Sequence, residues 1–380
     1  MEISKYHFDY DLKKRIVLIS DVHYYNKSII KTLNLVLQEI KKLRKADDNM
    51  VSIKEVAALA GVSPATVSRV MNGTANVDPE KKERVLQAIQ QTGFVPNEVA
   101  RTLFRKSAKT IGLIVPSIRN PYFTELAAHV DAMATANGFR PFLCNTGYDF
   151  EKEKAAMQML VSMNADAIII ASCSEQVRET INDCPIPVVA LDAMLYGADV
   201  EACVYCDYYW GGRMAAEHLI ENGCKHIVCI KGPQYRYSAR SRYQGYRDVC
   251  SEHGLEEHTV ECDYDFAQGM AMTEELLERF PDVDGIIACN DMVAISTYKV
   301  LHKRNISVPE QIQLIGFDDI SFTTLLSPEL TTIRQPVRQM AEKAVELIVN
   351  NELTSMTGGK FVFPVSLVVR QTTKKIGEEQ

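Results

Sequence analysis

Short apolar runs alternate with segments of helical length from residue 110 to residue 317, and this alternation constrains the fold more than any other feature. The run at residues 110–116 has the composition of a buried strand, and the segment at 121–137 is a predicted helix that ends at Gly138. The other predicted strands are residues 141–144, 167–170, 186–191, 226–230, 259–262, 285–288 and 312–317, with predicted helices at 150–163, 208–222, 239–253, 269–279 and 291–304. Strands that alternate with helices of this length predict parallel, doubly wound sheets. Because the pattern occurs twice, we expect an α/β core of two lobes, with ligands bound where the strands end at the cleft between them.

Residues 50–95 follow a different pattern, that of three short helices. At the start of the first helix, Ser52 is the predicted N-cap and Glu55 completes a capping box. Val56, Leu59 and Ala60 recur at helical spacing and predict its apolar face.

The turn after this helix defines the motif. Gly61 supplies the positive φ that the turn requires, Ser63 caps a second helix from Pro64 to Met71, and a third helix begins after Asp78. Two short helices joined by a glycine turn, with a third packed behind them, form a helix-turn-helix whose second helix can enter the major groove of DNA. A three-helix bundle with no ligand has the same helical pattern, so the pattern alone leaves both alternatives open.

The charge of the chain is unevenly distributed. The formal charge is +3 over residues 1–49 and +4 over residues 50–109, but −14 over residues 110–380. A basic head on an acidic body is typical of a protein that binds a polyanion. No apolar run approaches the roughly 18 residues of a membrane span. We therefore expect a cytoplasmic protein with no membrane partner.

All ten cysteines lie within residues 110–380. They are too sparse for a disulfide scaffold and are expected to be thiols. Cys203 and Cys206 have the spacing of a metal or redox pair, but no second pair or histidine follows at the spacing of zinc ligands. Because they lie on an apolar strand, where residues three apart face opposite sides, we expect two separate buried thiols. The prediction contains no metal site, no cofactor and no catalytic residue.

The head and the segment after it resemble the lactose-repressor/galactose-repressor (LacI/GalR) family of bacterial regulators. The resemblance rests on ordered runs at residues 53–57, 60–63 and 65–73, and on the pattern Pro-Asn-x-x-Ala-Arg-x-Leu at 96–103. It implies an all-α DNA-binding domain at 50–95, followed by a hinge helix and linker at 96–109. The residues that it assigns to DNA binding are Ser63, Pro64, Ala65, Thr66, Ser68, Arg69, Asn72, Asn97, Ala100, Arg101 and Leu103.

The body, residues 110–380, resembles the effector-binding core of the same family, which is related to periplasmic sugar-binding proteins. The matching landmarks include residues 120–123 (Asn-Pro-Tyr-Phe) and 316–319 (Gly-Phe-Asp-Asp). They imply a dimerising core in which the chain crosses between the lobes near residues 206, 335 and 363. The effector-binding residues that the resemblance implies are Phe123, Asp192, Arg242, Tyr264, Asn290, Asp318 and Gln335. Such side chains suit a sugar or a phosphosugar, because arginine donates hydrogen bonds, carboxylates accept them, and aromatic rings offer flat apolar faces.

Residues 1–49 precede Met50, near which members of this family normally begin. Residues 14–23 have the pattern of a strand that ends in Asp-x-His, with Asp21 and His23, and a predicted helix follows at about 27–44. This flank faintly resembles the first motif of calcineurin-like metallophosphoesterases, but the chain contains neither the Gly-Asp nor the Gly-Asn-His motif of that family. Two ligands cannot hold a catalytic metal, so we interpret the flank as an addition or a fragment.

The predicted function is a sequence-specific DNA-binding transcriptional regulator, a repressor of carbohydrate or related catabolic genes. It is expected to bind a palindromic operator in double-stranded DNA as a homodimer, under the control of a small-molecule effector in the cleft. Two alternatives come from other classes. The core alone predicts a sugar-binding receptor, although such a receptor is expected to carry a signal peptide and has no use for residues 50–109. The alternative that the protein is an enzyme is supported only by Asp21 and His23.

Overall fold

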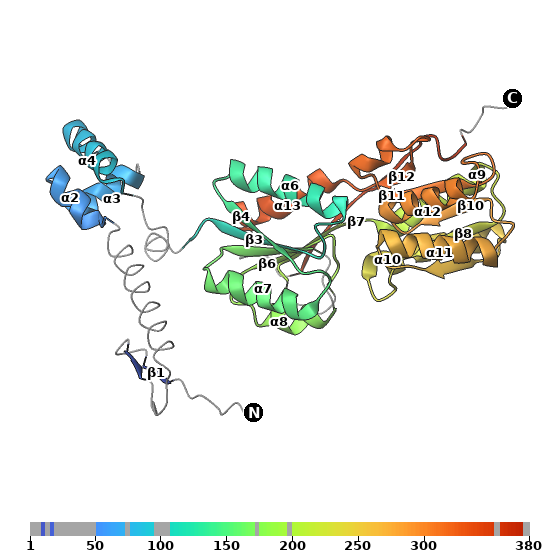
Figure 1. The fold of residues 1–380 in the computed structure, drawn as a ribbon, viewed down its shortest axis with the longest axis horizontal. Coiled ribbons are helices and arrows are strands. Elements are labelled where there is room, and N and C mark those ends of the chain that lie inside the picture. Colours follow the sequence, from blue (N-terminus) through green and yellow to red (C-terminus); the bar gives the residue numbers. More distant parts are fainter. Residues whose placement is uncertain are drawn as a thin grey trace, which may run out of the picture. The chain divides into compact units, whose positions relative to one another are not determined.

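The computed structural model describes residues 51–72, 77–94, 107–171, 175–195, 200–352 and 358–374, and two short strands near the N-terminus, β1 (Asp9–Asp11) and β2 (Ile16–Leu18). The chain divides into two units, residues 1–101 and 102–380 (Figure 1). β1 and β2 pair antiparallel, and β2 lies within the strand predicted at 14–23. Asp21, His23 and the helix predicted at 27–44 lie outside the described residues.

Besides β1 and β2, the described part of the first unit contains three helices: α2 (Ile53–Ala60), α3 (Pro64–Asn72) and α4 (Pro79–Thr92). The capping box predicted for α2 is confirmed, because the Ser52 side chain accepts the Glu55 N–H while Glu55 Oε2 accepts the Ser52 N–H at 2.6 Å. Gly61 ends α2 with a φ of 63°, a conformation that favours glycine. The local sequence therefore determines where α2 begins and ends.

A small core joins α2, α3 and α4. Its fully buried members are Val56, Ala57, Ala60, Val67, Val85 and Ala88. The prediction that Leu59 belongs to this core is wrong, since its side chain is 55% exposed and Ala57 is buried instead. The buried stripe of α2 runs through positions 56, 57 and 60, so Leu59 falls beside the stripe rather than on it.

The first lobe of the second unit contains a six-stranded sheet with the order β13-β7-β6-β5-β3-β4, in which every neighbouring pair is parallel. Its strands are β3 (Thr110–Val115), β4 (Arg140–Asn145), β5 (Ala167–Ala171), β6 (Val188–Leu191), β7 (Ala202–Cys206) and β13 (Gly359–Phe363). Its helices are α6 (Pro121–Ala136), α7 (Phe150–Ser162), α8 (Arg178–Asn182) and α13 (Val337–Val349).

The second lobe repeats this architecture. Its sheet has the order β14-β12-β11-β10-β8-β9, and only β14 runs antiparallel to its neighbour. Its strands are β8 (Ile227–Lys231), β9 (His258–Glu261), β10 (Gly285–Ala288), β11 (Gln313–Asp318), β12 (Thr331–Arg334) and β14 (Ser366–Val368). Its helices are α9 (Tyr208–Glu221), α10 (Tyr237–His253), α11 (Phe266–Arg279) and α12 (Asp291–Lys303). The prediction of two doubly wound parallel-sheet lobes is confirmed.

The chain passes from one sheet to the other three times. It leaves the first lobe after β7, returns after β12 to form α13 and β13, and leaves again to form β14. These crossings fall at the positions that the family resemblance implies. The predicted strands and helices between 110 and 317 all occur, with shifts of a few residues at their ends. The sequence analysis did not predict the type and bounds of five further elements: α8, β12, α13, β13 and β14.

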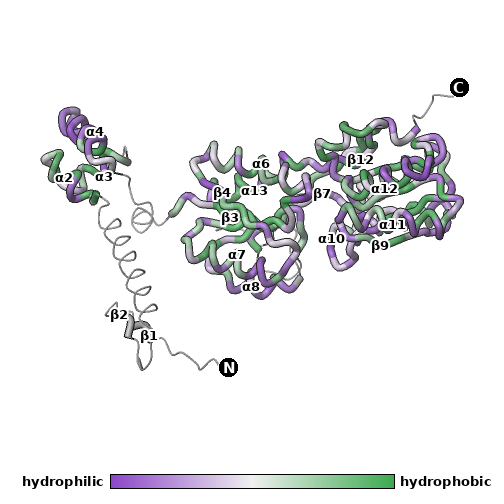
Figure 2. The backbone as a smooth tube through the Cα atoms, in the orientation of Figure 1, coloured by the Kyte–Doolittle hydropathy of each residue, from purple (hydrophilic) through white to green (hydrophobic). Residues whose placement is uncertain are grey.

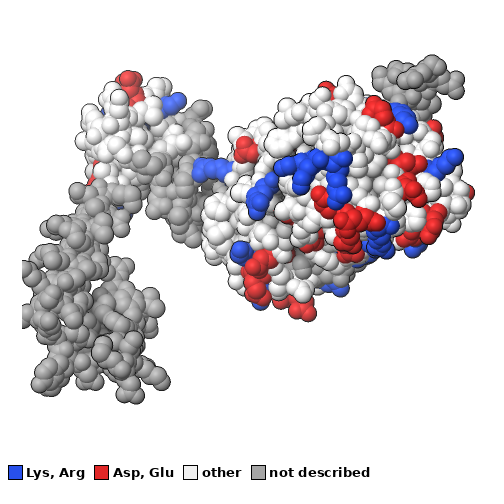
Figure 3. Space-filling view, turned by 45° about the vertical axis from the view of Figure 1, so that its right-hand side comes forward, with Lys and Arg blue, Asp and Glu red and all other residues white. Residues whose placement is uncertain are grey.

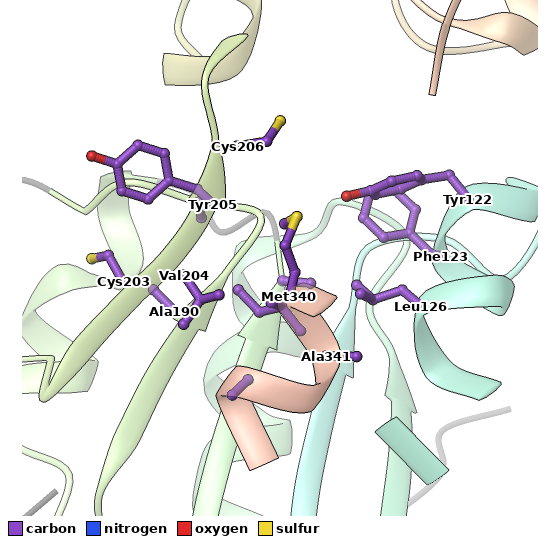
Figure 4. Packing of buried hydrophobic residues seen from close by; sticks show 14 of the residues in the cluster. Tyr122, Phe123, Leu126, Ala190, Cys203, Val204, Tyr205, Cys206, Met340 and Ala341 are labelled. Carbon is purple, nitrogen blue, oxygen red and sulfur yellow. The ribbon is translucent and has the colours of Figure 1, made fainter. Parts of the chain in front are cut away.

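The sheets form the interior of each lobe. Every residue of β5, β6 and β7 is buried, and Figure 2 shows hydrophobic residues along the central strands and alternating hydrophilic and hydrophobic residues along the helices. In the first lobe, Met340 and Ala341 of α13 pack beside Leu126 of α6 (Figure 4). Cys203 and Cys206 are buried free thiols whose side chains point away from one another, as predicted (Figure 4). Among the described helices, none is both long enough and apolar enough to cross a bilayer.

Candidate functional site

Side chains from both lobes surround one small pocket, here named the inner pocket. Its lining residues are Asn120, Tyr122, Phe123, Asp192, Ser238, Arg242, Tyr264, Asn290, Asp318 and Gln335. The structure therefore brings together all seven predicted effector residues. It adds Asn120, Tyr122 and Ser238, which the sequence analysis did not select. The free space is about 20 Å³, enough for about one water molecule.

The topology explains why these residues meet. Asp192 follows β6, Asp318 ends β11 and Gln335 follows β12, so each lies at the carboxyl end of a parallel strand. In doubly wound sheets this edge is the usual place for ligands, because the loops there converge where the strand order reverses. Here the carboxyl edges of two such sheets contribute to the same pocket.

Arg242 on α10 is held from several sides. Its guanidinium lies 3.6 Å from the centroid of the Phe317 ring and 5.3 Å from that of Tyr208, and Nη1 donates a 2.7 Å hydrogen bond to the Cys289 carbonyl. Burial alone would lower the pKa of Arg242, but Asp318 and other neighbouring groups raise it above its usual value. Its Nε is buried and has no hydrogen-bond partner among the described residues. Arg242 is thus a rigid cation with a donor available to a ligand.

Two aspartates in corresponding places of the two lobes adopt unusual backbone conformations. Asp192 has a φ of 57° and Asp318 a φ of 126°, a region that favours glycine and costs of the order of 1–3 kcal/mol for other residues. Burial raises the pKa of Asp192, while a 2.6 Å hydrogen bond from the Tyr208 hydroxyl opposes that rise. Burial also raises the pKa of Asp318, against the attraction of Arg242. Strained backbone that places buried carboxyl groups in a pocket is typical of a ligand-binding site.

A chain of hydrogen bonds links the two lobes beside these carboxyl groups. The Tyr122 hydroxyl donates to Gln335 Oε1 at 3.3 Å, and Gln335 Nε2 donates to Asp318 Oδ1 at 2.7 Å. The Cys206 thiol donates to the same Gln335 oxygen at 3.0 Å. Tyr122 belongs to the first lobe and Asp318 to the second, while Gln335 lies on a crossing segment. A ligand that competes for Gln335 would therefore change the contacts between the lobes.

The remaining pocket residues combine structural and ligand-facing features. Asn290 caps α12 by accepting the Val293 N–H at 2.8 Å, so only part of its hydrogen-bonding capacity is available. Phe123 contributes an apolar ring that packs edge-on against Tyr122. The Tyr264 hydroxyl is buried near Ser238 and makes no well-formed hydrogen bond among the described residues. Together with Arg242, it offers donors that a ligand hydroxyl can satisfy.

Asp291, next to Asn290, forms a buried network directly behind the pocket. Its carboxylate accepts the Thr332 hydroxyl at 2.6 Å and the Ile320 N–H at 2.9 Å, which anchors the turn that follows Asp318. Burial raises the pKa of Asp291 to about 7. The sequence analysis quoted Asp291 only as a family landmark, because the partner groups are 29 and 41 residues away in the sequence.

The predicted DNA-binding residues concentrate on α3. Ser63, Pro64, Ala65 and Arg69 are exposed, whereas Thr66 and Ser68 are half-buried. The Ser63 side chain accepts the Thr66 N–H at 3.2 Å and thereby caps the helix. The side chain of Asn72 and residues Asn97, Ala100, Arg101 and Leu103 lie outside the described residues.

The charged side chains do not form one uniform surface. Figure 3 shows basic and acidic groups side by side on the visible face of the second unit. Four of the nine lysines and arginines within residues 50–109 occur at 101–109. The basic surplus of the head therefore comes mainly from the predicted hinge. Within the described residues, no group of three or more metal-ligating side chains is placed to hold a metal ion.

Comparisons with known proteins cover most of the chain. The sequence model for bacterial regulatory proteins of the lacI family matches residues 52–97, and the model for periplasmic binding proteins and the sugar binding domain of the LacI family matches residues 108–357. The ribose operon repressor of Halalkalibacterium halodurans is 37% identical over 326 residues, which cover 86% of this chain and 98% of that protein.

Solved structures show the same similarity. A periplasmic binding protein/LacI transcriptional regulator from Alkaliphilus metalliredigens, complexed with D-xylulofuranose, is 33% identical with a TM-score of 0.63, covering 70% of this chain and all of that one. The lac repressor dimer bound to operator and the anti-inducer ONPF is 25% identical with a TM-score of 0.76, covering 85% of this chain and 98% of that one. These matches confirm the resemblance predicted from the head and the core. The chain therefore belongs to the LacI family of bacterial regulatory proteins and is a DNA-binding transcriptional regulator.

Proposed function

We propose that this regulator represses carbohydrate genes by binding a palindromic operator as a homodimer, and that a sugar in the inner pocket controls its affinity for DNA. The observation that carries the proposal is the convergence of Arg242, Asp192 and Asp318 on one pocket between two lobes. Buried charges with adjacent aromatic rings suit a ligand that has many hydroxyl groups and little net charge. Such a regulator acts in the cytoplasm, where its operator lies.

The mechanism is linkage between two sites. The inner pocket leaves about 20 Å³ free, so a sugar that enters it displaces contacts that its side chains now make with one another. The hydrogen bonds from Tyr122 to Gln335 and from Gln335 to Asp318 are then exchanged for bonds to the sugar. The sugar stabilises one arrangement of the two lobes. If that arrangement changes the spacing of the two DNA-binding heads of the dimer, the affinity for DNA changes as well.

The residues proposed to contact DNA are those assigned by the sequence: Ser63, Pro64, Ala65, Thr66, Ser68, Arg69 and Asn72 in the major groove, and Asn97, Ala100, Arg101 and Leu103 in the hinge. The exposure of Arg69 at the last turn of α3 supports this assignment. The proposal assigns no catalytic step to the protein, and two of the relatives named above, the ribose operon repressor and the lac repressor, are repressors.

The test uses the full chain. Repeated selection from random DNA duplexes should enrich a near-palindromic sequence, because a symmetric dimer requires two related half-sites. Fluorescence anisotropy with the selected duplex, measured with and without each member of a panel of sugars, should then find a sugar that changes the Kd at least tenfold. Failure to enrich a palindrome would refute operator binding, and indifference to every sugar would refute the proposed effector class.

A further inference from the structure

The first lobe contains a cavity of its own, separate from the inner pocket. This space, here named the helix groove, has a volume of about 460 Å³ and shares no lining residue with the inner pocket. It lies between α7 and the segment that runs from η1 (Glu175–Val177) through α8 to Pro185, and Figure 1 shows α7 and α8 on the same side of the first lobe. A volume of this size is within the range of about 300–1,000 Å³ that is typical of small-molecule sites.

The helix groove follows from the way α7 packs. Met157 and Leu160 are buried in the core of the lobe, and α7 contacts β3 and η1 but has little direct contact with α8. Phe150, Lys154 and Val161 lie on the adjacent stripe of α7, at helical spacings of four and seven residues, and line the groove. Because all the described lining residues belong to the first lobe, the groove does not depend on how the two lobes are arranged.

The deeper part of the helix groove is uncharged. Among the lining residues, Met157 is buried, and Phe150, Val161, Thr180 and Cys184 are half-buried. Burial raises the pKa of the Cys184 thiol, which therefore stays neutral at neutral pH. Since most of these side chains are hydrocarbon or thioether, this surface favours an apolar part of a ligand.

The outer part of the helix groove carries charges of opposite sign on its two walls. Lys154 is on the α7 wall, whereas Glu179 and Asp183 are on the α8 wall, and all three residues are exposed. None of the three side chains forms an ion pair or a hydrogen bond with another described residue. The described lining of the groove contains no other charged residue. One cation therefore lies across the cavity from two carboxylates with which it forms no ion pair.

This arrangement of charges discriminates between classes of ligand. An anion that is attracted by Lys154 is repelled by Glu179 and Asp183, and a cation that is attracted by the carboxylates is repelled by Lys154. A zwitterion satisfies both walls at once, because each of its charges can lie beside a wall of opposite sign. An amino acid combines such a pair of charges with a side chain that can occupy the uncharged part of the groove.

We propose that the helix groove binds a free amino acid with an apolar side chain. Its carboxylate lies beside Lys154, its ammonium group lies beside Glu179 and Asp183, and its side chain lies over Met157 and Phe150. This inference goes beyond the sugar-controlled repression proposed above and does not rest on it, because the two sites have no residue in common. It gives the regulator a second small-molecule site, contained in the first lobe.

Calorimetric titration of the full chain tests the ligand class. The probes are L-leucine, L-methionine and L-phenylalanine, and at least one of them should bind with a Kd below about 1 mM. For the tightest of the three, the amine that lacks the carboxylate and the acid that lacks the ammonium group should each bind at least about threefold more weakly. For leucine, these analogues are 3-methylbutylamine and 4-methylpentanoate. L-Serine, which lacks an apolar side chain, should also bind more weakly.

Variants of the two walls test the location of the site. Lys154→Met and Glu179→Gln should each weaken binding of the amino acid about threefold to fivefold, the effect of one partly exposed charge pair, and the double variant should weaken it about tenfold. Both positions are exposed, so the fold should be retained. Lys152→Met and Glu151→Gln change the same residue types at exposed positions of α7 outside the groove, and they serve as matched controls that should have no effect.

Every other outcome overturns the proposal or a named part of it. If none of the three amino acids binds, the helix groove is not an amino acid site. Equal binding of the amine or the acid would refute the zwitterionic class, and equal binding of L-serine would refute the role of the apolar side chain. Binding that is lost in Arg242→Lys but kept in Lys154→Met would place the amino acid in the inner pocket.

Discussion

Nη2 of Arg242 lies 3.6 Å from Oδ1 of Asp318, although both side chains are almost entirely buried. This separation is longer than a hydrogen bond but short enough for a strong electrostatic attraction. A ligand hydroxyl beside the pair can accept a hydrogen bond from the guanidinium and donate one to the carboxylate. The two groups therefore form a buried ion pair with no direct hydrogen bond between them.

Replacing Arg242 with lysine should separate ligand recognition from DNA binding. Lysine keeps the charge but loses the planar fork and the stacking on Phe317. We expect sugar affinity to fall about ten- to a hundredfold, the effect of losing a hydrogen bond to a charged group, while operator affinity stays unchanged. Calorimetry with the active sugar and anisotropy with the selected operator measure the two quantities. Arg338→Lys, at an exposed arginine of α13, is the control. An unaltered sugar affinity would place Arg242 outside the site.

Gly212→Ala should destabilise the second lobe. A Cβ at this position would lie 2.0 Å from the carbonyl oxygen of Arg242, so α9 and α10 would have to move apart. Overpacking of this kind typically costs about 1–3 kcal/mol, and here the obstacle is backbone that cannot rotate away. The melting temperature should fall by several degrees, and sugar affinity should weaken because Arg242 is displaced. Ser251→Ala on the exposed face of α10 is the control. Equal melting temperatures for both variants would contradict the close helix contact.

The sequence predicted the elements of the core well because each has its own local signal. Strands such as β5 are continuous apolar runs, and a helix such as α6 begins at a cap, here Asn120, and ends two residues before a glycine, here Gly138. The sequence analysis did not predict the helix α13. This helix follows a crossing between the lobes, and the regular alternation of strand and helix is interrupted there. Leu59 shows the limit of periodicity, since burial depends on which neighbouring helix covers a face.

The site was predictable only in part. Its seven effector residues came from the family resemblance, while their convergence depends on two sheets that the sequence cannot place side by side. Tyr122 and Ser238 were missed because their types and positions are equally compatible with packing or capping. The bridge through Gln335 joins residues up to 213 positions apart, a relationship that no local pattern carries.

Asp291→Asn should remove a pH dependence of stability. The pKa of Asp291 is raised to about 7 in the folded chain, whereas an unfolded aspartate has a pKa of about 3.9. The folded state thus binds more protons between these values, and the contribution of Asp291 to stability is lost as the pH rises from about 4 to about 7. Asparagine carries no charge, and its side-chain oxygen can still accept the Ile320 N–H. Its side-chain NH₂ group can donate a hydrogen bond to the Thr332 hydroxyl oxygen.

The melting temperature of the variant, measured relative to the native chain, should therefore rise across this pH window and level off above pH 7. Thermal unfolding of the full chain at half-unit intervals of pH measures the difference. Asp282→Asn, at an exposed turn, should give a curve parallel to that of the native chain. A parallel curve for Asp291→Asn as well would show that Asp291 is already ionised well below pH 7.

Arg69→Ala should weaken specific DNA binding without unfolding the head. Arg69 is exposed at the end of α3, and the core formed by Val56, Val67 and Val85 does not include it. A bidentate contact between arginine and guanine is worth about 1–3 kcal/mol, so affinity for the selected operator should fall about five- to a hundredfold, while affinity for random DNA changes little. Lys82→Ala removes an exposed cation from α4 and controls for net charge. Since four cations at 101–109 remain, the slope of log Kd against log salt should change by at most about one for either variant. Equal losses on operator and random DNA would show that Arg69 contacts phosphate alone.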